Sequence, residues 1–503
     1  MKVILFRLCT VALLLRCSLS KAYLNDHNNT ILLNLAHELL SGSFNAGDGY
    51  PQVWARDFGT FVELALDVNP PETIRNILLG FFCRQKSNGE APGGFTYSES
   101  NKHNKTNPCV GIPSLSSDYR YQACDAFNLD GVCKNDCETD QETSLILAVH
   151  KYVGKTKDSK FLSVVVNGFT ILERLEMSLQ WLQRNRTAPE PYSPLLWGGT
   201  TLDWGDVQAE QGLLWKWWCW YWNGKVHIPN VSMLNLCSHP SIDVYDNSMF
   251  VMALDAFTNM IQMQNPSESN IKSYYRKRKW LTLAQQVRNG IRKHLWIPVA
   301  YRFRTHIYLD TYSTKIVAVQ AGLPSFVAGS PFSKENFPPG KNEDFINYHG
   351  AAASASLAGG ILSRAEVKKV LAQQFRDIDQ VTNDGGTATV GLTMYPVYAN
   401  MGGTIKPYVY QNAGDWAWFG GRMVSALVKY NLIEEARKAL KPMVDRVVEH
   451  GMFYEWWSVL NGQPKGSKNF RGSAGVLTKA IRDLQAANIT LMVFKSESVA
   501  DIE

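Results

Sequence analysis

Hydrophobic residues recur at intervals of three and four along most of the chain, which is the spacing of amphipathic α-helices. The runs come in pairs, and a long polar connection follows many of the pairs. Pro71 stands at the start of one run, where its missing N–H costs nothing. The predicted helical segments are 30–40, 53–68, 69–85, 142–154, about 160–183, 247–263, 273–296, 363–375, 414–431, 432–451 and 472–484.

This repetition of helical hairpins predicts a single large toroid in which each hairpin buries its apolar face against the next. No Pro/Ser-rich linker divides the chain, so we expect one domain over residues 21–503. Short turns would gather at one end of the ring and long loops at the other, and long loops are where function is carried.

Residues 1–20 have the features of a cleaved signal peptide, with early positive charge, an apolar stretch and small residues at Ser18 and Ser20. Arg7 and Arg16 interrupt the apolar stretch, which argues against an uncleaved anchor. No later segment has the uninterrupted apolar length of a membrane span. We therefore expect a secreted protein or one that resides in the lumen of the secretory pathway.

The cysteines agree with secretion, because seven of the nine follow the predicted signal peptide. Three disulfides with Cys83 free in its apolar surroundings are the economical prediction. A zinc site is the alternative, although the polar segment 109–137, which holds four of the cysteines, lacks paired Cys-x-x-Cys spacing. Asn-x-Ser/Thr sequons are compatible with glycosylation. The six cysteines expected to pair are Cys109, Cys124, Cys133, Cys137, Cys219 and Cys237.

The bulk composition is that of an ordinary folded protein, with 45% hydrophobic and 19% charged residues and a formal charge of +6. A basic cluster at 274–280 is typical of a solvated helix face, and we expect no nucleic-acid partner. The fifteen Trp are unusual, and several stand among polar residues. There an indole offers a flat apolar face and one hydrogen-bond donor to a ligand.

Two acidic residues have aromatic neighbours that ordinary surface positions lack. Asp203 lies between Leu202 and Trp204 in "GGTTLDWGDVQ", a setting that favours the protonated carboxyl a general acid needs. Asp206 competes for that role, and an Asx-type turn is the structural alternative. Glu455 lies in "FYEWW", where an ion pair under a helix end is the structural alternative.

Two carboxylates on opposite flanks of a cleft are the minimum machinery for cleaving a glycosidic bond. One protonates the leaving oxygen, and the other activates water or attacks the anomeric carbon. No metal or other cofactor is needed. Motifs of serine hydrolases, zinc proteases, P-loop enzymes and dinucleotide-binding enzymes do not occur.

Polar and aromatic residues elsewhere supply groups that could hold a sugar. In "WARD" the Arg and the carboxylate could bind two adjacent sugar hydroxyls, and the structural alternative is a helix-start charge with an ordinary ion pair. In "ETDQE" Asp140 could contact the substrate, and the structural alternative is a helix-capping cluster. "YQNAGDW" adds amides and an aromatic platform. The predicted substrate-binding residues are Trp54, Arg56, Asp57, Asp140, Trp204, Asp206, Gln411, Asn412, Asp415 and Trp416.

Three segments in order, "VWARDF", "YQNAGDWAWFGGRMVSALVKYNLIEEARKAL" and "FYEWWSVLNGQPKGSKNFRGSAGVL", resemble elements of the six-hairpin glycoside hydrolases. Among these, alkaline/neutral invertases, processing α-glucosidase I and trehalases look nearest. The resemblance spans about residues 50–484 and implies an all-α (α/α)6 toroid. It implies Asp203 as the acid and Glu455 as the second carboxylate, with inversion favoured. The chain departs from the family pattern at Ala413 and in "GGTTLDWGDVQ", and trehalase signatures are absent.

The expected function is hydrolysis of a glycosidic bond, in an α-linked glucoside or a similar small saccharide. One alternative keeps the fold but uses phosphate as the acceptor, for which Arg422, Lys406 and His349 are candidate ligands. The other is a carbohydrate-binding protein without catalysis.

Overall fold

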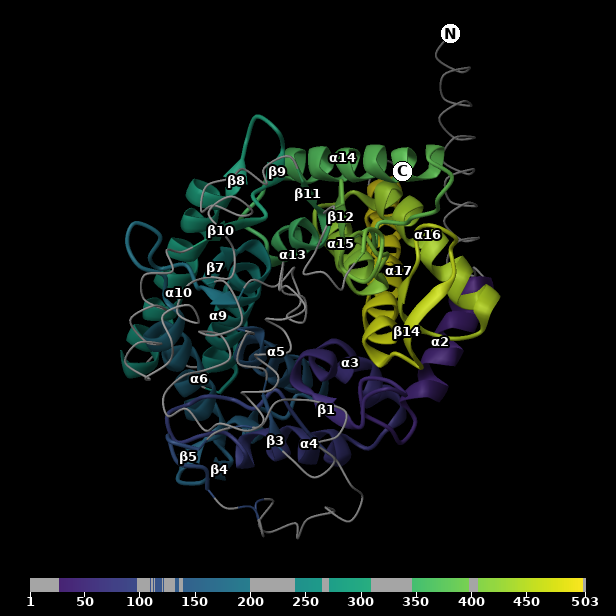
Figure 1. The fold of residues 1–503 in the computed structure, drawn as a ribbon. Helices are drawn as coiled ribbons and strands as arrows, with labels where there is room; N and C mark the ends of the chain where they lie inside the picture. The colour runs from purple at the N-terminus through teal and green to yellow at the C-terminus, as the bar shows by residue number, and fades with distance from the viewer. Residues whose placement is uncertain are drawn as a thin grey trace.

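The ring architecture is visible in Figure 1. The computed structural model describes residues 27–96, 109, 112, 114–119, 121, 132–134, 139–199, 240–264, 271–308, 346–397 and 406–500. Along these residues, helices of an outer layer alternate with helices of an inner layer. The fold is therefore an all-α (α/α)6 toroid, and this prediction is confirmed.

Six inner helices surround the axis of the ring, and each packs against the next. The last of them returns to the first, which closes the ring. The inner helices are α3 (Ala55–Val68), α5 (Asp140–Thr156), α9 (Val244–Gln264), α13 (His349–Ala358), α15 (Ala417–Lys429) and α17 (Arg471–Ala500). The outer helices are α2 (His27–Leu40), α4 (Pro71–Cys83), α6 (Ile171–Arg186), α10 (Ile271–Gly290), α14 (Arg364–Asn383) and α16 (Ile433–His450).

The two layers differ in how their side chains are buried. Residues 417–427 of α15 are buried without a break, because neighbours surround an inner helix on nearly every side. Helix α16 buries only a stripe that includes Ala436, Leu440, Met443 and Val447. This stripe has the spacing expected of a helix that faces solvent on its other side.

Two predicted helical assignments need correction. The helix expected from about residue 160 begins only at Ile171, after a 3₁₀ turn (Ser159–Ser163) and a small hairpin. Asn167 and Gly168 have positive φ, as a two-residue hairpin turn requires. Helix α13 was absent from the predicted segments because its run of Ala, Gly and Ser has no polar face to mark a period.

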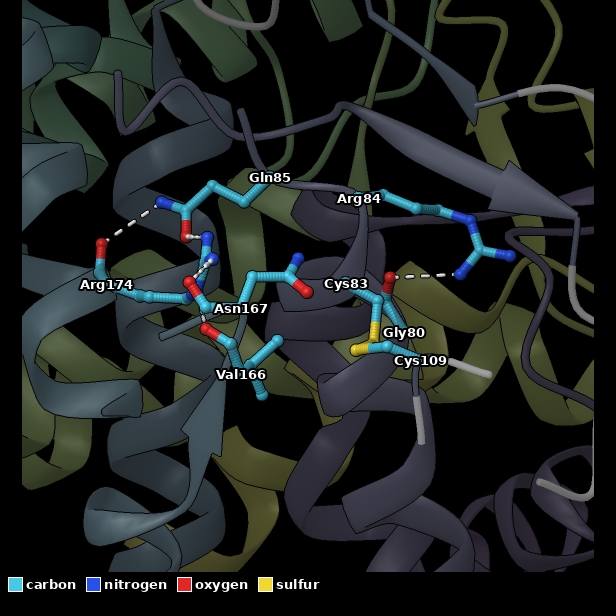
Figure 2. Close-up of a disulfide and its surroundings, with 8 residues drawn as sticks. All are labelled: Gly80, Cys83, Arg84, Gln85, Cys109, Val166, Asn167 and Arg174. Atoms are coloured by element: carbon cyan, nitrogen blue, oxygen red, sulfur yellow. Dashed lines mark hydrogen bonds between the residues drawn. A yellow bond between two sulfur atoms is a disulfide. The ribbon is translucent and has the colours of Figure 1, made fainter. Parts of the chain in front are cut away.

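The prediction that Cys83 is free is wrong. Cys83 forms a disulfide with Cys109, which carries the following loop back onto the end of α4 (Figure 2). Apolar surroundings do not exclude a disulfide, because a cystine is itself readily buried. Cys133 is also disulfide-bonded. The other cysteines of the predicted three pairs lie outside the described residues.

Short antiparallel strands join the helices and bring distant segments together. The strands of the two three-stranded sheets and of the pairs β11–β12 and β13–β14 are β1 (Gln52–Trp54), β2 (Gly94–Thr96), β3 (Val132–Cys133), β6 (Gly198–Gly199), β7 (Pro240–Asp243), β10 (His306–Tyr308), β11 (Asn347–Tyr348), β12 (Met394–Tyr395), β13 (Tyr454–Trp457) and β14 (Pro464–Lys468). The remaining hairpins are β4 (Val165–Val166) with β5 (Phe169–Thr170) and β8 (Trp296–Ile297) with β9 (Arg302–Phe303). Among the described helices, none is both long and apolar enough to cross a membrane.

Candidate active site

The predicted site residues gather where the inner helices begin. Strand β1 ends at Trp54 and runs directly into α3, β7 runs into α9, and Trp416 immediately precedes α15. Asp140 is the first residue of α5. The positive ends of several helix dipoles therefore meet at one end of the ring, where they favour negatively charged groups.

An aromatic cluster covers this end of the axis. Tyr410 lies between two of its rings, with centroid distances of 4.9 Å to Trp416 and 6.2 Å to Trp456, both edge to face. Tyr50 and Trp54 contact each other at 6.4 Å and pack against the same cluster. The buried members of the cluster are Tyr245, Trp416, Trp418, Phe419, Trp456 and Phe470, together with Ala46 and Met249.

Glu455 is buried beside this cluster and is held at both carboxylate oxygens. The hydroxyl of Tyr50 donates to Oε1 at 3.0 Å, and the amide of Ser467 donates to Oε2 at 2.7 Å. The ring of Tyr50 also contacts Trp54, so Tyr50 lies between Glu455 and Trp54 in the site. The two hydrogen bonds fix the orientation of the carboxylate. A group that acts on a bound water or sugar must be held in this way.

A second buried network connects three of the inner helices. Arg56 of α3 donates to both carboxylate oxygens of Asp140 on α5, at 2.7 and 2.8 Å. The hydroxyl of Tyr245 on α9 donates to Asp140 at 2.9 Å. Burial raises the pKa of Tyr245 well above its usual value, and the charge of Asp140 adds to that rise. Arg56 and Asp140 thus form an ion pair, the structural alternative that the sequence left open for Arg56, and Asp57 is buried next to Arg56 in the first turn of α3.

Two predicted binding residues carry polar groups that the described part of the chain does not satisfy. Both amide atoms of Gln411 are buried without a hydrogen-bond partner, and so is the indole N–H of Trp54. Asn412 donates to the carbonyl of Lys406 at 3.3 Å. Buried polar groups usually have partners, so these atoms are suited to receive a polar ligand.

Asp415 faces away from the aromatic cluster, toward the outer layer. Its carboxylate accepts from the amide and hydroxyl of Thr389 at 2.5 and 2.9 Å and from Arg446 of α16 at 2.6 Å. These bonds hold the segment that enters α15. Asp415 therefore supports the site, and its direct contact with a substrate stays a prediction.

Asp203, Trp204 and Asp206 lie outside the described residues. Gly198 and Gly199, which precede them, form β6 and pair with Ser241 and Pro240 of β7. Strand β7 leads directly into α9, which begins at the same end of the ring as Trp54 and Asp140.

A buried acidic pair without a predicted role lies at the start of α9. Asp246 shares a side-chain hydrogen bond with Asp243, and Asp140 and Arg56 are within electrostatic range. Burial raises the pKa of Asp246 well above its usual value, and the charge of Asp243 adds to the rise. The signal was present in the polar segment "SIDVYDN", but the segment does not show that these carboxyls converge on Asp140.

His349, a candidate phosphate ligand, has a buried carboxylate partner. Its Nε2 lies 2.9 Å from Asp377 of the outer helix α14, and Asn347 donates to the same carboxylate at 2.7 Å. This buried network links the inner and outer layers. His349 therefore has a structural partner, which weakens its place as a phosphate ligand.

No protein-family model and no curated protein matches this sequence. Solved structures do match the fold. The chain is similar to a GH63 mannosylglycerate hydrolase from Thermus thermophilus in complex with glucose, with a TM-score of 0.53 and 15% identity over 89% of this chain and 99% of that one. It is also similar to a rhamnosidase from Klebsiella oxytoca with rhamnose bound, with a TM-score of 0.50 and 10% identity over 90% of this chain and 63% of that one.

At these sequence identities the structural matches show a shared fold. The match covers nearly the full length of the hydrolase, so the likeness extends around the whole ring and not only to a few hairpins. The chain is accordingly an (α/α)6 toroid of the architecture seen in these glycosidases.

Proposed function

We propose that the protein is a glycoside hydrolase that acts on an α-linked glucoside or a similar small saccharide at the aromatic end of the ring. Glu455 acts as the base on water, and Asp203 protonates the leaving oxygen. The anomeric centre inverts, as the sequence resemblance favours. The likeness to two carbohydrate-bound structures supports a sugar as the ligand.

The arrangement around Glu455 is the observation that carries this proposal. A carboxylate buried among aromatic rings and gripped by a hydroxyl and an amide has one orientation. The structural alternative, an ion pair under a helix end, has less support. Glu455 lies within strand β13, five residues past the end of α16 at His450.

The neighbouring groups suit a polyhydroxylated ring. Aromatic faces pack against the apolar faces of a pyranose, and the Gln411 amide and the Trp54 indole offer the hydrogen bonds that its hydroxyls need. The Arg56–Asp140 pair adds a donor and an acceptor on one side. Asp203 suits the acid role because Leu202 and Trp204 flank it in the sequence, a setting that favours the protonated carboxyl.

Secretion belongs to the same proposal. A disulfide persists in an oxidising compartment, so the Cys83–Cys109 bond supports entry into the secretory pathway. The signal peptide over residues 1–20 would direct it there.

The test is a hydrolysis screen of disaccharides and glycans with the full mature chain, followed by NMR of the first anomer released. Inversion and retention give opposite anomers. A parallel reaction with added inorganic phosphate separates hydrolysis from phosphorolysis, which would release a sugar phosphate. Ligand binding without turnover by the wild-type protein would overturn the proposal in favour of a binding protein.

The roles are tested by matched substitutions. Glu455→Gln and Asp203→Asn should each lower kcat by about 10²–10⁴ with little change in KM, the usual contribution of a general acid or base. Asp206→Asn should be milder. Asp246→Asn mimics a protonated carboxyl and should also be mild. A ranking in which Asp206→Asn or Asp246→Asn is the more damaging would move the acid role to that residue.

A further inference from the structure

A separate cavity lies inside the ring, below the aromatic cluster. Its volume is about 140 Å³, and all six inner helices contribute to its lining. It runs from Arg56, near the start of α3, to Lys151, Lys479 and Asp483, which lie several turns along their helices. The side chain of Lys479 is 44% exposed, so this lower end is reached from the face opposite the candidate active site.

The charges that line the cavity are unbalanced. Arg56 is neutralised by Asp140, and Lys479 pairs with Asp483 at 2.6 Å. Lys151 donates to the carbonyl of Gly59 at 2.6 Å and is within electrostatic range of Glu63. Arg422 is only 9% exposed, and no carboxylate among the described residues lies within ion-pair distance of it.

Arg422 has only weak partners in place of a counter-ion. One guanidinium nitrogen lies 3.4 Å from the sulfur of Met249 and 3.4 Å from the hydroxyl of Ser354. The guanidinium also lies over the rings of Trp418 and Tyr245, at 5.0 and 5.5 Å. An arginine keeps its proton, so burial without an anion costs free energy that these contacts offset only in part.

A buried hydroxyl of α5 lines the same cavity. Ser144 is 2% exposed, lines the cavity, and its Oγ has no hydrogen-bond partner among the residues described. A hydroxyl donates readily to an anion. The space holds about four or five water volumes, at about 30 Å³ each, which is room for a small anion and a few waters of its hydration shell.

We propose that this cavity is a binding site for a small inorganic anion, held by Arg422 and Ser144, with Lys151 contributing positive charge. Chloride and inorganic phosphate are both small anions that accept hydrogen bonds from a guanidinium and a hydroxyl. Both would enter the cavity past Lys479. The cavity shares Arg56 with the candidate active site, but Arg422 and Ser144 are not among the predicted substrate-binding residues, so the proposal stands whether or not the protein hydrolyses glycosides.

The test uses the full mature chain and three sodium salts at constant ionic strength: chloride, phosphate and gluconate, the last too large for the cavity. Thermal unfolding should occur at a higher temperature in chloride or phosphate than in gluconate, in a saturable manner. Bromide soaked into crystals should give an anomalous peak beside Arg422. Unfolding temperatures that are equal in all three salts, or bromide that avoids the cavity, would overturn the proposal.

The substitution Arg422→Met should weaken anion binding at least tenfold, whereas Arg292→Met, on the outside of the ring, should leave it unchanged. Ser144→Ala provides a milder second variant if Arg422→Met does not fold, and it should weaken binding severalfold. If both single variants, Arg422→Met and Ser144→Ala, bind the anion with wild-type affinity, the proposed site is contradicted. The salt that stabilises at the lower concentration identifies whether chloride or phosphate is preferred.

Discussion

Gly466 of β14 packs its backbone directly against Glu455. Its φ is +71°, and a Cβ at this position would lie 2.7 Å from the Cβ of Glu455 and closer still to the carboxylate. At the scale of single residues, therefore, the orientation of the proposed base depends on a glycine 11 residues away in the sequence as much as on the Tyr50 hydroxyl.

Gly466→Ala should push Glu455 out of position and lower kcat by roughly 10²-fold, since an error of about 1 Å in a catalytic group has that effect. Gly462→Ala is the matched control. Gly462 has a similar φ of +68°, but its added Cβ would meet Thr387 and not Glu455. Equal activity losses in the two variants would mean that backbone strain, and not the displaced carboxylate, causes the defect.

Lys151 should make stability depend on pH. Burial lowers the pKa of Lys151 from 10.5 to about 8, and neighbouring charges including Lys479 and Arg422 contribute to the change. Between these values the unfolded chain binds a proton that the folded chain does not, so this residue adds stability as pH rises from about 8 to 10.5. Below about pH 8 the full cost of the buried charge is present.

The free energy of unfolding of Lys151→Met should therefore be about 1–2 kcal/mol higher than that of wild type at about pH 7. This estimate takes about 1.36 kcal/mol per pKa unit and subtracts the contribution of the hydrogen bond from Lys151 to Gly59 that the variant loses. The gain should disappear near pH 10.5. Denaturant titrations in gluconate at both pH values measure it. Lys155→Met, partly exposed and paired with Asp67, should show no such pH-dependent gain.

At the scale of elements, the inner and outer helices are joined by buried polar pairs as well as by apolar contact. Arg446 of α16 reaches Asp415 at the entry of α15, and Asp377 of α14 reaches His349 at the entry of α13. Both pairs lie beside the starts of inner helices. The outer layer thus fixes the segments from which the candidate site is built.

Arg446→Met should destabilise the protein by about 3–5 kcal/mol, because it leaves the fully buried carboxylate of Asp415 without its cation. Lys441→Met on the same helix removes an exposed i,i+4 pair with Asp445 and should cost under about 1 kcal/mol. Chemical denaturation compares the two. Similar small losses in both would show that Thr389 alone satisfies Asp415.

At the scale of the whole molecule, the ring closes when α17 packs against α3, the two inner helices farthest apart in the sequence. The disulfide between Cys83 and Cys109 acts more locally, on a loop that leaves the C-terminal end of α4 (Figure 2). Nearby, Arg174 of α6 donates to the side chain of Gln85 and to the carbonyl of Val166, which ties adjacent hairpins together.

Cys109→Ser should lower the free energy of unfolding by about 3–4 kcal/mol, because the bond closes a loop with a sequence separation of 26. Cys109 is the better position to change, since it is less buried than Cys83. Unfolding under oxidising conditions measures the loss. An unchanged unfolding midpoint in Cys109→Ser would show that the loop is held by its other contacts.

The amino-acid sequence by itself determined the helical rhythm, the hairpin ring and the identity of many candidate site residues. These features are encoded locally, in hydrophobic spacing and in short motifs such as "WARD" and "FYEWW". It did not reveal α13, whose small residues carry no periodic pattern, because an inner helix is buried on all sides.

Only the tertiary structure decided which residues meet. Tyr50 reaches Glu455 across 405 residues, Asp140 joins Arg56 and Tyr245, and Asp415 turns outward to Arg446. It also paired Cys83 with Cys109 and left Arg422 facing an internal cavity with no carboxylate of the described residues in ion-pair reach. The physical reason is that hydrogen bonds, ion pairs and disulfides depend on distances between segments, and ring closure sets those distances.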